Sequence, residues 1–220
     1  MTVVEIDVED NFKELFDADK GEQVSDKVFV DVGGYDGDTV AKALDINPNL
    51  RILVIEPIKR LCDLMKQKFQ SNPNITIINK AAYNKKGNIQ FNEYEGWSKG
   101  LSTVQSIMTQ IRPERLFTSQ ISKYNIEADT IDNILSDLGM SNVDIDYIKI
   151  DTEGSEEPVL LGFTKYHKGT RFHIESHIIN LENILQTLLE MGVNIEKITV
   201  GRDGNIKEHV VGSVIGEFTR

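Results

Sequence analysis

Two carboxylates follow an apolar run in the second half of the sequence, at a position suited to proton transfer. Asp151 and Glu153 come directly after residues 146–150 (DYIKI), and Gly154 then allows the backbone to turn. A carboxylate can accept the proton of an alcohol as the alcohol oxygen attacks an electrophile, a contribution of about 10²–10⁴-fold in rate. We therefore predict that one of these two acids acts as a general base.

A third acid lies in the next apolar run, residues 171–176 (RFHIES). Glu175 is flanked by His173 and His177, and the period of two in a strand places these three side chains on one face. Asp151, Glu175 and His177 could together hold a divalent cation. No further ligand spacing supports a metal, so we favour a hydrogen-bonded polar cluster that orients a substrate and predict no metal site. His173 is expected to be buried and structural.

A glycine-rich turn follows the first apolar run, over residues 31–39 (DVGGYDGDT). Glycine lacks the Cβ atom that would keep a ligand away from the backbone, so such a turn can hold a nucleotide-like cofactor. The dinucleotide pattern GxGxxG does not fit, because Tyr35 and Asp38 occupy two of its glycine positions. An acid two residues before Gly33, with a further glycine four residues after it, instead resembles motif I of class I S-adenosylmethionine methyltransferases.

A single acid, Glu56, ends the second apolar run, residues 51–56 (RILVIE), 23 residues after Gly33. A carboxylate at the end of a second strand can accept hydrogen bonds from both ribose hydroxyls of an adenosine cofactor. The turn and the acid together favour a cofactor site. A tight turn next to a surface glutamate is the structural alternative.

Six blocks of the sequence together resemble the FkbM family of S-adenosylmethionine-dependent methyltransferases. They are DVGGYDGDT (31–39), VIEP (54–57), NKAAYNKKGNIQF (79–91), ADTIDNIL (128–135), DYIKIDTEGSEEPVLLG (146–162) and RFHIES (171–176). The resemblance spans residues 28–177. It implies a class I methyltransferase fold and transfer of a methyl group to an alcohol oxygen, commonly on a sugar or a natural-product scaffold, with S-adenosylhomocysteine as the product.

The turn, the second-strand acid and the matching blocks define the expected site. The predicted cofactor contacts are Asp31, Gly33, Gly34, Tyr35, Gly37, Asp38, Thr39, Glu56, Pro57, Ala81 and Asp151. The predicted catalytic residues are Asp151, Glu153, Glu175 and His177. Two alternatives stay open: a non-catalytic nucleotide-binding domain on the same fold, and an NAD-dependent oxidoreductase. The second would need the GxGxxG pattern that is absent.

Apolar runs alternate with helical spacing along the chain. Strands of the sheet are expected at 27–32, 51–56, 75–78, 146–151, 171–176, 194–200 and 207–215, with an added strand at 89–94, and helices at 38–45, 58–70, 129–138, 155–162 and 181–191. This order predicts an α/β, doubly wound, mostly parallel seven-stranded sheet with helices on both faces. The last two strands have no helix between them, so they are expected to pair in antiparallel fashion through Asp203-Gly204.

The composition limits the partners. The chain has 220 residues, 40% of them hydrophobic, and a net charge of −11, which disfavours nucleic acid and anionic membranes as partners. No apolar run is long enough to span a membrane, and the N-terminus lacks a signal-peptide pattern. Cys62 is the single cysteine. It is expected on the apolar face of a helix, as a small residue of the protein core. A reducing, cytoplasmic location is the simplest interpretation.

Two segments differ in charge from the rest. Residues 1–26 hold nine acids and two lysines and predict an acidic leader with a short helix, ahead of a methyltransferase domain over 27–220. Residues 97–126 hold four basic residues and one acid. This segment is either a lid or specificity insert, in which Arg112 and Arg115 meet an anionic substrate group, or a surface insert. The oligomeric state is left open.

Overall fold

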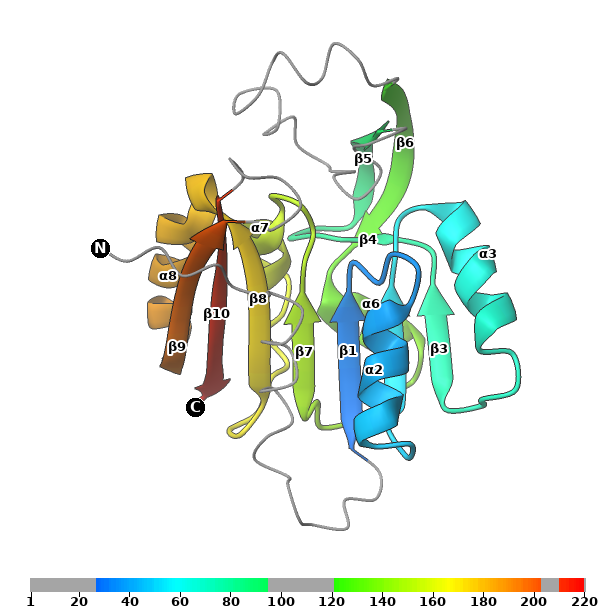
Figure 1. Cartoon of the computed structure of the whole chain (residues 1–220), viewed down its shortest axis with the longest axis horizontal. Coiled ribbons are helices and arrows are strands. Elements are labelled where there is room, and N and C mark those ends of the chain that lie inside the picture. The colour runs from blue at the N-terminus through cyan, green and yellow to red at the C-terminus, as the bar shows by residue number, and fades with distance from the viewer. Residues whose placement is uncertain (1–26, 95–120, 203–209, 220) are drawn as a thin grey trace.

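Seven strands form one twisted sheet at the centre of the protein. The structure is a computed structural model that describes residues 27–94, 121–202 and 210–219. Of residues 94, 121, 177–180, 201–202 and 210–212 it describes the backbone only. The strands of this sheet are β1 (Val28–Val32), β2 (Arg51–Ile55), β3 (Ile75–Ile78), β7 (Tyr147–Ile150), β8 (Arg171–His177), β9 (Val193–Arg202) and β10 (Val210–Phe218). Their order across the sheet is β3-β2-β1-β7-β8-β10-β9 (Figure 1).

The strand directions confirm the expected fold class. Strands β3, β2, β1, β7 and β8 pair in parallel, whereas β10 runs antiparallel to both β8 and β9. The order of the strands reverses at β1, which lies between β2 and β7. In an open α/β sheet, ligands bind beyond the carboxyl ends of the strands at such a point. The fold therefore directs attention to the residues that follow β1, β2, β7 and β8.

Helices cover the sheet on both sides, each with one buried apolar stripe. On one side α2 (Asp38–Ile46) and α3 (Lys59–Lys68) bury Val40, Ala43 and Met65 against side chains of β1 and β2. On the other side lie α6 (Ile131–Asp137), α7 (Glu156–Leu161) and α8 (Ile178–Met191), which build the larger core with the alternate residues of the same strands. Cys62 of α3 is fully buried, as expected for a core residue. Within the described part of the chain, no helix is long and apolar enough to cross a membrane.

A second, smaller sheet was not expected. It consists of β4 (Ala81–Ala82), β6 (Ile121–Asp129) and β5 (Gly87–Tyr94), in that order. Strand β6 carries polar and exposed residues over most of its length. Among its residues 122–129, whose side chains the structure describes, Ile126, Ala128 and Asp129 are the buried ones, so no apolar run predicts this strand. The helix expected from residue 129 accordingly begins two residues later, because Asp129 still belongs to β6 and Thr130 is the N-cap of α6.

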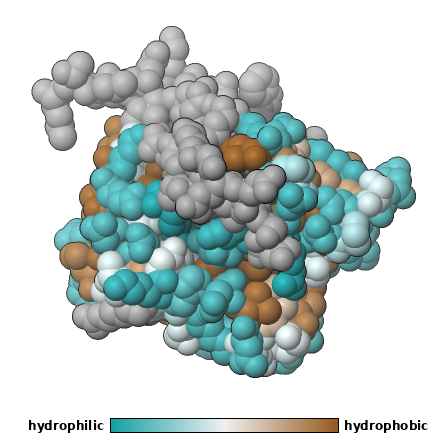
Figure 2. All heavy atoms as spheres, turned by 90° about the horizontal axis from the view of Figure 1, so that it is seen from below, coloured by the Kyte–Doolittle hydropathy of each residue, from teal (hydrophilic) through white to brown (hydrophobic). Residues whose placement is uncertain are grey.

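Several expected features fall outside the described residues. They are the leader over 1–26, the part of the expected insert over 97–120, and the Asp203-Gly204 turn. Residues 121–126 of that insert belong to β6. Figure 2 shows the face seen from below in Figure 1, where hydrophilic and hydrophobic residues intermix.

Candidate active site

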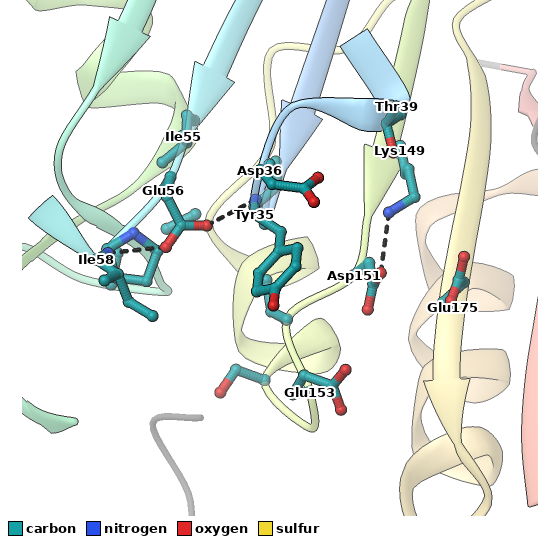
Figure 3. A pocket seen from close by; sticks show the side chains of 18 of the residues that line it. Tyr35, Asp36, Thr39, Ile55, Glu56, Ile58, Lys149, Asp151, Glu153 and Glu175 are labelled. Carbon is teal, nitrogen blue, oxygen red and sulfur yellow. Dashed lines mark hydrogen bonds and ion pairs between the residues drawn. The ribbon is translucent and has the colours of Figure 1, made fainter. Parts of the chain in front are cut away.

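A cavity of about 410 Å³ lies at the carboxyl ends of β1, β2, β7 and β8 (Figure 3). This volume lies within the range of small-molecule sites, about 300–1,000 Å³. Most of the predicted site residues line it: Gly33, Gly34, Tyr35, Asp38, Thr39, Glu56, Pro57, Ala81, Asp151, Glu153 and Glu175. Of the other predicted residues, Asp31 and Gly37 do not line the cavity. His177 ends β8, and its side chain lies outside the described residues.

The turn after β1 needs glycine for reasons internal to the chain. Gly33 has a φ of +86°, and a Cβ atom on it would lie 1.8 Å from the backbone oxygen of Asp151. A Cβ atom on Gly34 would lie 2.2 Å from a methyl group of Val54. The turn therefore packs directly against the end of β7 and against β2. This close packing brings the backbone that follows β1 to the edge of the cavity.

Tyr35 stands where motif I commonly has a glycine, and its backbone explains that preference. Its φ is +47°, in the left-handed region that glycine occupies most easily. In this conformation the Tyr35 N–H donates a hydrogen bond of 3.0 Å to Oε2 of Glu56. The turn and the second-strand acid, 21 residues apart, are thus joined directly.

Glu56 is a buried carboxylate rather than a surface group. It is only 4% exposed, and its Oε1 accepts a second backbone hydrogen bond, of 2.8 Å, from Ile58. Burial raises the pKa of Glu56 to about 7, against the effect of the two N–H donors. Each carboxylate oxygen can accept more than one hydrogen bond, so Glu56 keeps acceptor capacity toward the cavity. The surface-glutamate alternative is therefore wrong.

The opposite end of the cavity holds a charged cluster around a lysine. Lys149, in the centre of β7, is 4% exposed, and its Nζ lies 3.0 Å from Oδ2 of Asp151. Its strand neighbours in register are Asp31 on β1 and His173 on β8. Figure 3 shows Lys149, Asp151 and Glu175 on the adjacent ends of β7 and β8. Although burial opposes it, the charges of Asp151, Glu175 and Asp31 hold the pKa of Lys149 above its usual range.

Asp31 lies beside Lys149 on the neighbouring strand β1 and is fully buried. Neither of its carboxylate oxygens has a hydrogen-bond partner among the described residues. Burial raises the pKa of Asp31 to about 6, although the charge of Lys149 acts in the other direction. A buried acid without a hydrogen-bond donor is unusual in a native protein and is a feature of ligand sites.

The turn that carries Glu153 is held by a buried acid that the sequence analysis did not single out. Oε1 of Glu156 accepts hydrogen bonds from the N–H of Thr152 (3.0 Å), its hydroxyl (3.2 Å) and the N–H of Gly154 (2.9 Å). Glu153, between these two residues, has a φ of +53°. The turn thus presents a left-handed Glu153 at the wall of the cavity.

His173 of β8 is structural, as expected. His173 is fully buried, and its Nε2 lies 2.7 Å from Oγ of Ser213 on β10. Burial lowers the pKa of His173 to about 3, so the ring is neutral at physiological pH. Among the residues that the structure describes, no three His, Cys, Asp or Glu side chains gather in a way that could hold a metal ion.

Two residues of the site were missed, and one of them had a signal. Lys149 interrupts the apolar run DYIKID of a strand that the expected fold buries on both faces. A lysine there must be paired with an acid, because an unpaired buried charge is very costly. Glu156 had no such signal, because acids are common in the first turn of any helix.

The comparisons with known proteins agree with this geometry. The sequence model of the family described as "Methyltransferase FkbM domain" matches residues 31–205. No protein of curated function matches the sequence.

Three solved structures illustrate the likeness in fold. An rRNA methylase from Streptococcus thermophilus is 8% identical, with a TM-score of 0.55 and coverage of 100% of both chains. The N-methyltransferase NodS from Bradyrhizobium japonicum WM9 is 9% identical, with a TM-score of 0.52 and coverage of 96% of both chains. Aeropyrum pernix fibrillarin, in complex with natively bound S-adenosyl-L-methionine, is 13% identical, with a TM-score of 0.54 and coverage of 92% of this chain and 74% of that one. At such identities the likeness concerns the fold alone.

Fold and site together define a methyltransferase. The family match covers most of the chain, so the protein belongs to the FkbM methyltransferase family. This confirms the resemblance seen in the sequence and the expected cofactor, S-adenosylmethionine. It also argues against the NAD-dependent oxidoreductase alternative.

Proposed function

We propose that this protein transfers the methyl group of S-adenosylmethionine to a hydroxyl oxygen of a small molecule or a glycosyl unit. The observation that carries the proposal is one cavity with two differently built ends. One end offers the glycine turn and Glu56, and the other offers Asp151, Glu153 and Glu175. The first end suits an adenosine cofactor, and the second suits an alcohol that must lose a proton.

The residues present fit the cofactor. Glu56 would accept the ribose hydroxyls through the lone pairs that its two backbone hydrogen bonds leave free. The turn around Gly33 and Gly34 would carry the amino-acid portion, close to the Asp31 carboxylate, which accepts no hydrogen bond from the described residues. The remaining predicted contacts that line the cavity are proposed as its walls: Tyr35, Asp38, Thr39, Pro57, Ala81 and Asp151. Gly37 is proposed to act through the shape of the turn, where its φ is +80°. S-adenosylmethionine supplies a methyl group already activated by a positively charged sulfur.

The protein's part in the reaction is orientation and proton acceptance. We assign Asp151 to the region of the cofactor methyl group and Glu153 to the acceptor hydroxyl, with one of them accepting its proton. Glu175 and His177 are proposed to orient the acceptor. Holding two reactants in line contributes about 7–11 kcal/mol in favourable cases, and a positioned base adds about 10²–10⁴-fold.

The charge of the cavity supports a small-molecule acceptor over a nucleic acid. Among the described residues that line it, six are acids and two are lysines, Lys42 and Lys149. Binding of a phosphate backbone depends on a basic surface, which these residues do not provide. An acceptor without phosphate groups therefore suits this cavity better, although one of the structures with the same fold is an rRNA methylase.

Label transfer tests the proposal. The protein is incubated with methyl-labelled S-adenosylmethionine and sets of sugars, natural-product alcohols, amines or RNA, and the labelled product is analysed for an O–CH₃ group. We expect label on an alcohol oxygen, and a turnover about 10²–10⁴-fold lower in Asp151→Asn or Glu153→Gln. Label on nitrogen or on RNA would contradict the O-methylation of a small molecule. Loss of activity with a chelator, restored by Mg²⁺, would make the carboxylates metal ligands.

A further inference from the structure

The charged cluster at the end of β7 contains a cation that the methyl-transfer proposal does not use. Lys149 extends from the middle of the central strand to the cavity wall, where its Nζ is 3.0 Å from Oδ2 of Asp151. It is 4% exposed, so its charge is poorly screened by water. Lys149 is therefore a fixed positive charge at the end of the cavity where the proposed reaction takes place.

Groups on three neighbouring elements surround this ammonium. Asp31 faces it from β1, Asp151 from the end of its own strand, and Glu175 and His173 from β8. His173 is neutral, with a pKa lowered to about 3 by burial. The cluster thus combines three carboxylates with one ammonium, and its total charge is negative when all three acids are ionised.

We propose that Lys149 sets the charge of the methyl-transfer end of the cavity, and thereby its preference between the sulfonium donor and the thioether product. This inference rests on the proposed function, in which S-adenosylmethionine binds here. The donor carries one positive charge more than S-adenosylhomocysteine, and the extra charge sits on the sulfur that loses the methyl group. Carboxylates near that sulfur favour the donor, whereas the Lys149 ammonium offsets them and limits the preference.

The inference predicts opposite effects for the opposite charges of one cluster. In Lys149→Met the end of the cavity becomes more negative, so the ratio of donor affinity to product affinity rises about tenfold. In Glu175→Gln it becomes less negative, and the ratio falls about tenfold. Both values correspond to unit charges about 12 Å apart at an effective dielectric constant near 20. A purely structural role for Lys149 would weaken the binding of both ligands together and leave their ratio unchanged.

Isothermal titration calorimetry of both ligands at pH 8 tests this. At that pH Asp31, whose pKa is about 6, is ionised. Lys149→Arg, which keeps the charge, should retain the wild-type ratio. Lys165→Met is the matched control, because Lys165 is exposed and lies in the segment that leads into the opposite end of β8. Its ratio should stay within about twofold of the wild type.

The outcomes separate the two proposals. An unchanged ratio in Lys149→Met, or a fall in that ratio, overturns the role of Lys149 while leaving the cofactor assignment intact. If Lys149→Met does not fold, Lys149→Gln takes its place, because it also removes the positive charge but keeps a polar side chain; it should raise the ratio, and an unchanged ratio in Lys149→Gln overturns the role of Lys149. A wild-type protein that binds neither ligand overturns the proposed function itself and this inference with it.

Discussion

The two ends of the cavity satisfy their buried carboxylates in different ways. At the β2 end, Glu56 is held by the backbone N–H groups of Tyr35 and Ile58. At the β7 end, Asp151 is paired with the side chain of Lys149, and Asp31 on β1 has no hydrogen-bond partner among the described residues. The first end depends on backbone shape, and the second on a balance of charges. Substitutions should therefore act through geometry at one end and through electrostatics at the other.

The largest effect is expected where backbone shape matters most. Gly33→Ala places a Cβ atom 1.8 Å from the Asp151 oxygen and imposes a left-handed φ on alanine. We expect a loss of more than about 4 kcal/mol in the free energy of unfolding, measured in urea. Gly139→Ala is the matched control, with a φ of +70° but open space around the new Cβ, and should cost about 1 kcal/mol. Equal losses in the two variants would show that the turn can move away from β7.

Removal of the backbone-held acid should weaken cofactor binding. Glu56→Ala loses charge-assisted hydrogen bonds worth about 1.5–3 kcal/mol, so the affinity for S-adenosylmethionine should fall by about one to two powers of ten. Calorimetry measures this directly. Asp63→Ala removes an exposed acid of α3 as a control and should leave the affinity unchanged. An unaltered affinity in Glu56→Ala would mean that Glu56 does not reach the ribose.

At the charge-balanced end, a stabilising substitution is expected. The pKa of Asp31 is raised, so its carboxyl group stays protonated up to about pH 6 in the folded protein. In the unfolded chain the same group loses its proton near pH 4. The buried charge therefore costs stability as the pH rises between these values, and the full cost applies above pH 6. Two pKa units correspond to at most about 2.7 kcal/mol. We expect Asp31→Asn to stabilise the free protein by about 1–2 kcal/mol at pH 8.

The pH dependence provides the control for Asp31. Urea unfolding at pH 8 and at pH 5 should show a smaller gain for Asp31→Asn at the lower pH, where the wild-type carboxyl is mostly protonated in the folded state. A variant that is less stable than the wild type at pH 8 would show that the Asp31 carboxylate has a partner in the folded protein. The same variant should bind S-adenosylmethionine more weakly, since the proposed role of Asp31 is in the ligand site.

The smallest effect is expected at the start of α7. Ser155 occupies the N-cap position of α7, but its side chain makes no capping hydrogen bond. Ser155→Ala should therefore change the free energy of unfolding by less than about 0.5 kcal/mol. Thr130 of α6 is the comparison, because its hydroxyl accepts a 3.0 Å hydrogen bond from the Asn133 N–H, and Thr130→Ala should cost about 1 kcal/mol. Equal costs would indicate a cap at Ser155.

The contrast between local backbone features and charges shared among strands also explains which parts of the fold and of the site could be predicted from the sequence. Strands β1, β2, β7 and β8 are apolar runs, and the glycine turn and Glu56 are local features at fixed distances from them. These strands, the turn and the acid could therefore be predicted from the sequence without knowledge of tertiary contacts. Strand β6 has no apolar run and was missed, because its ladder with β5 depends on partners 27 to 41 residues away. Lys149 had a signal in its own run, but two of the acids that act on it, Glu175 and Asp31, lie on neighbouring strands and are brought to it only by the fold.

The central claim is that the cavity binds S-adenosylmethionine and its product. A thermal melt with S-adenosylhomocysteine tests it most directly, because a ligand at 100 times its Kd stabilises the native state by about 2.7 kcal/mol. For a chain of this size that corresponds to a rise in Tm of about 5–10 °C. We expect this rise with the wild type, a smaller one with Glu56→Ala, and none with NADH. A rise with NADH and none with S-adenosylhomocysteine would contradict the account.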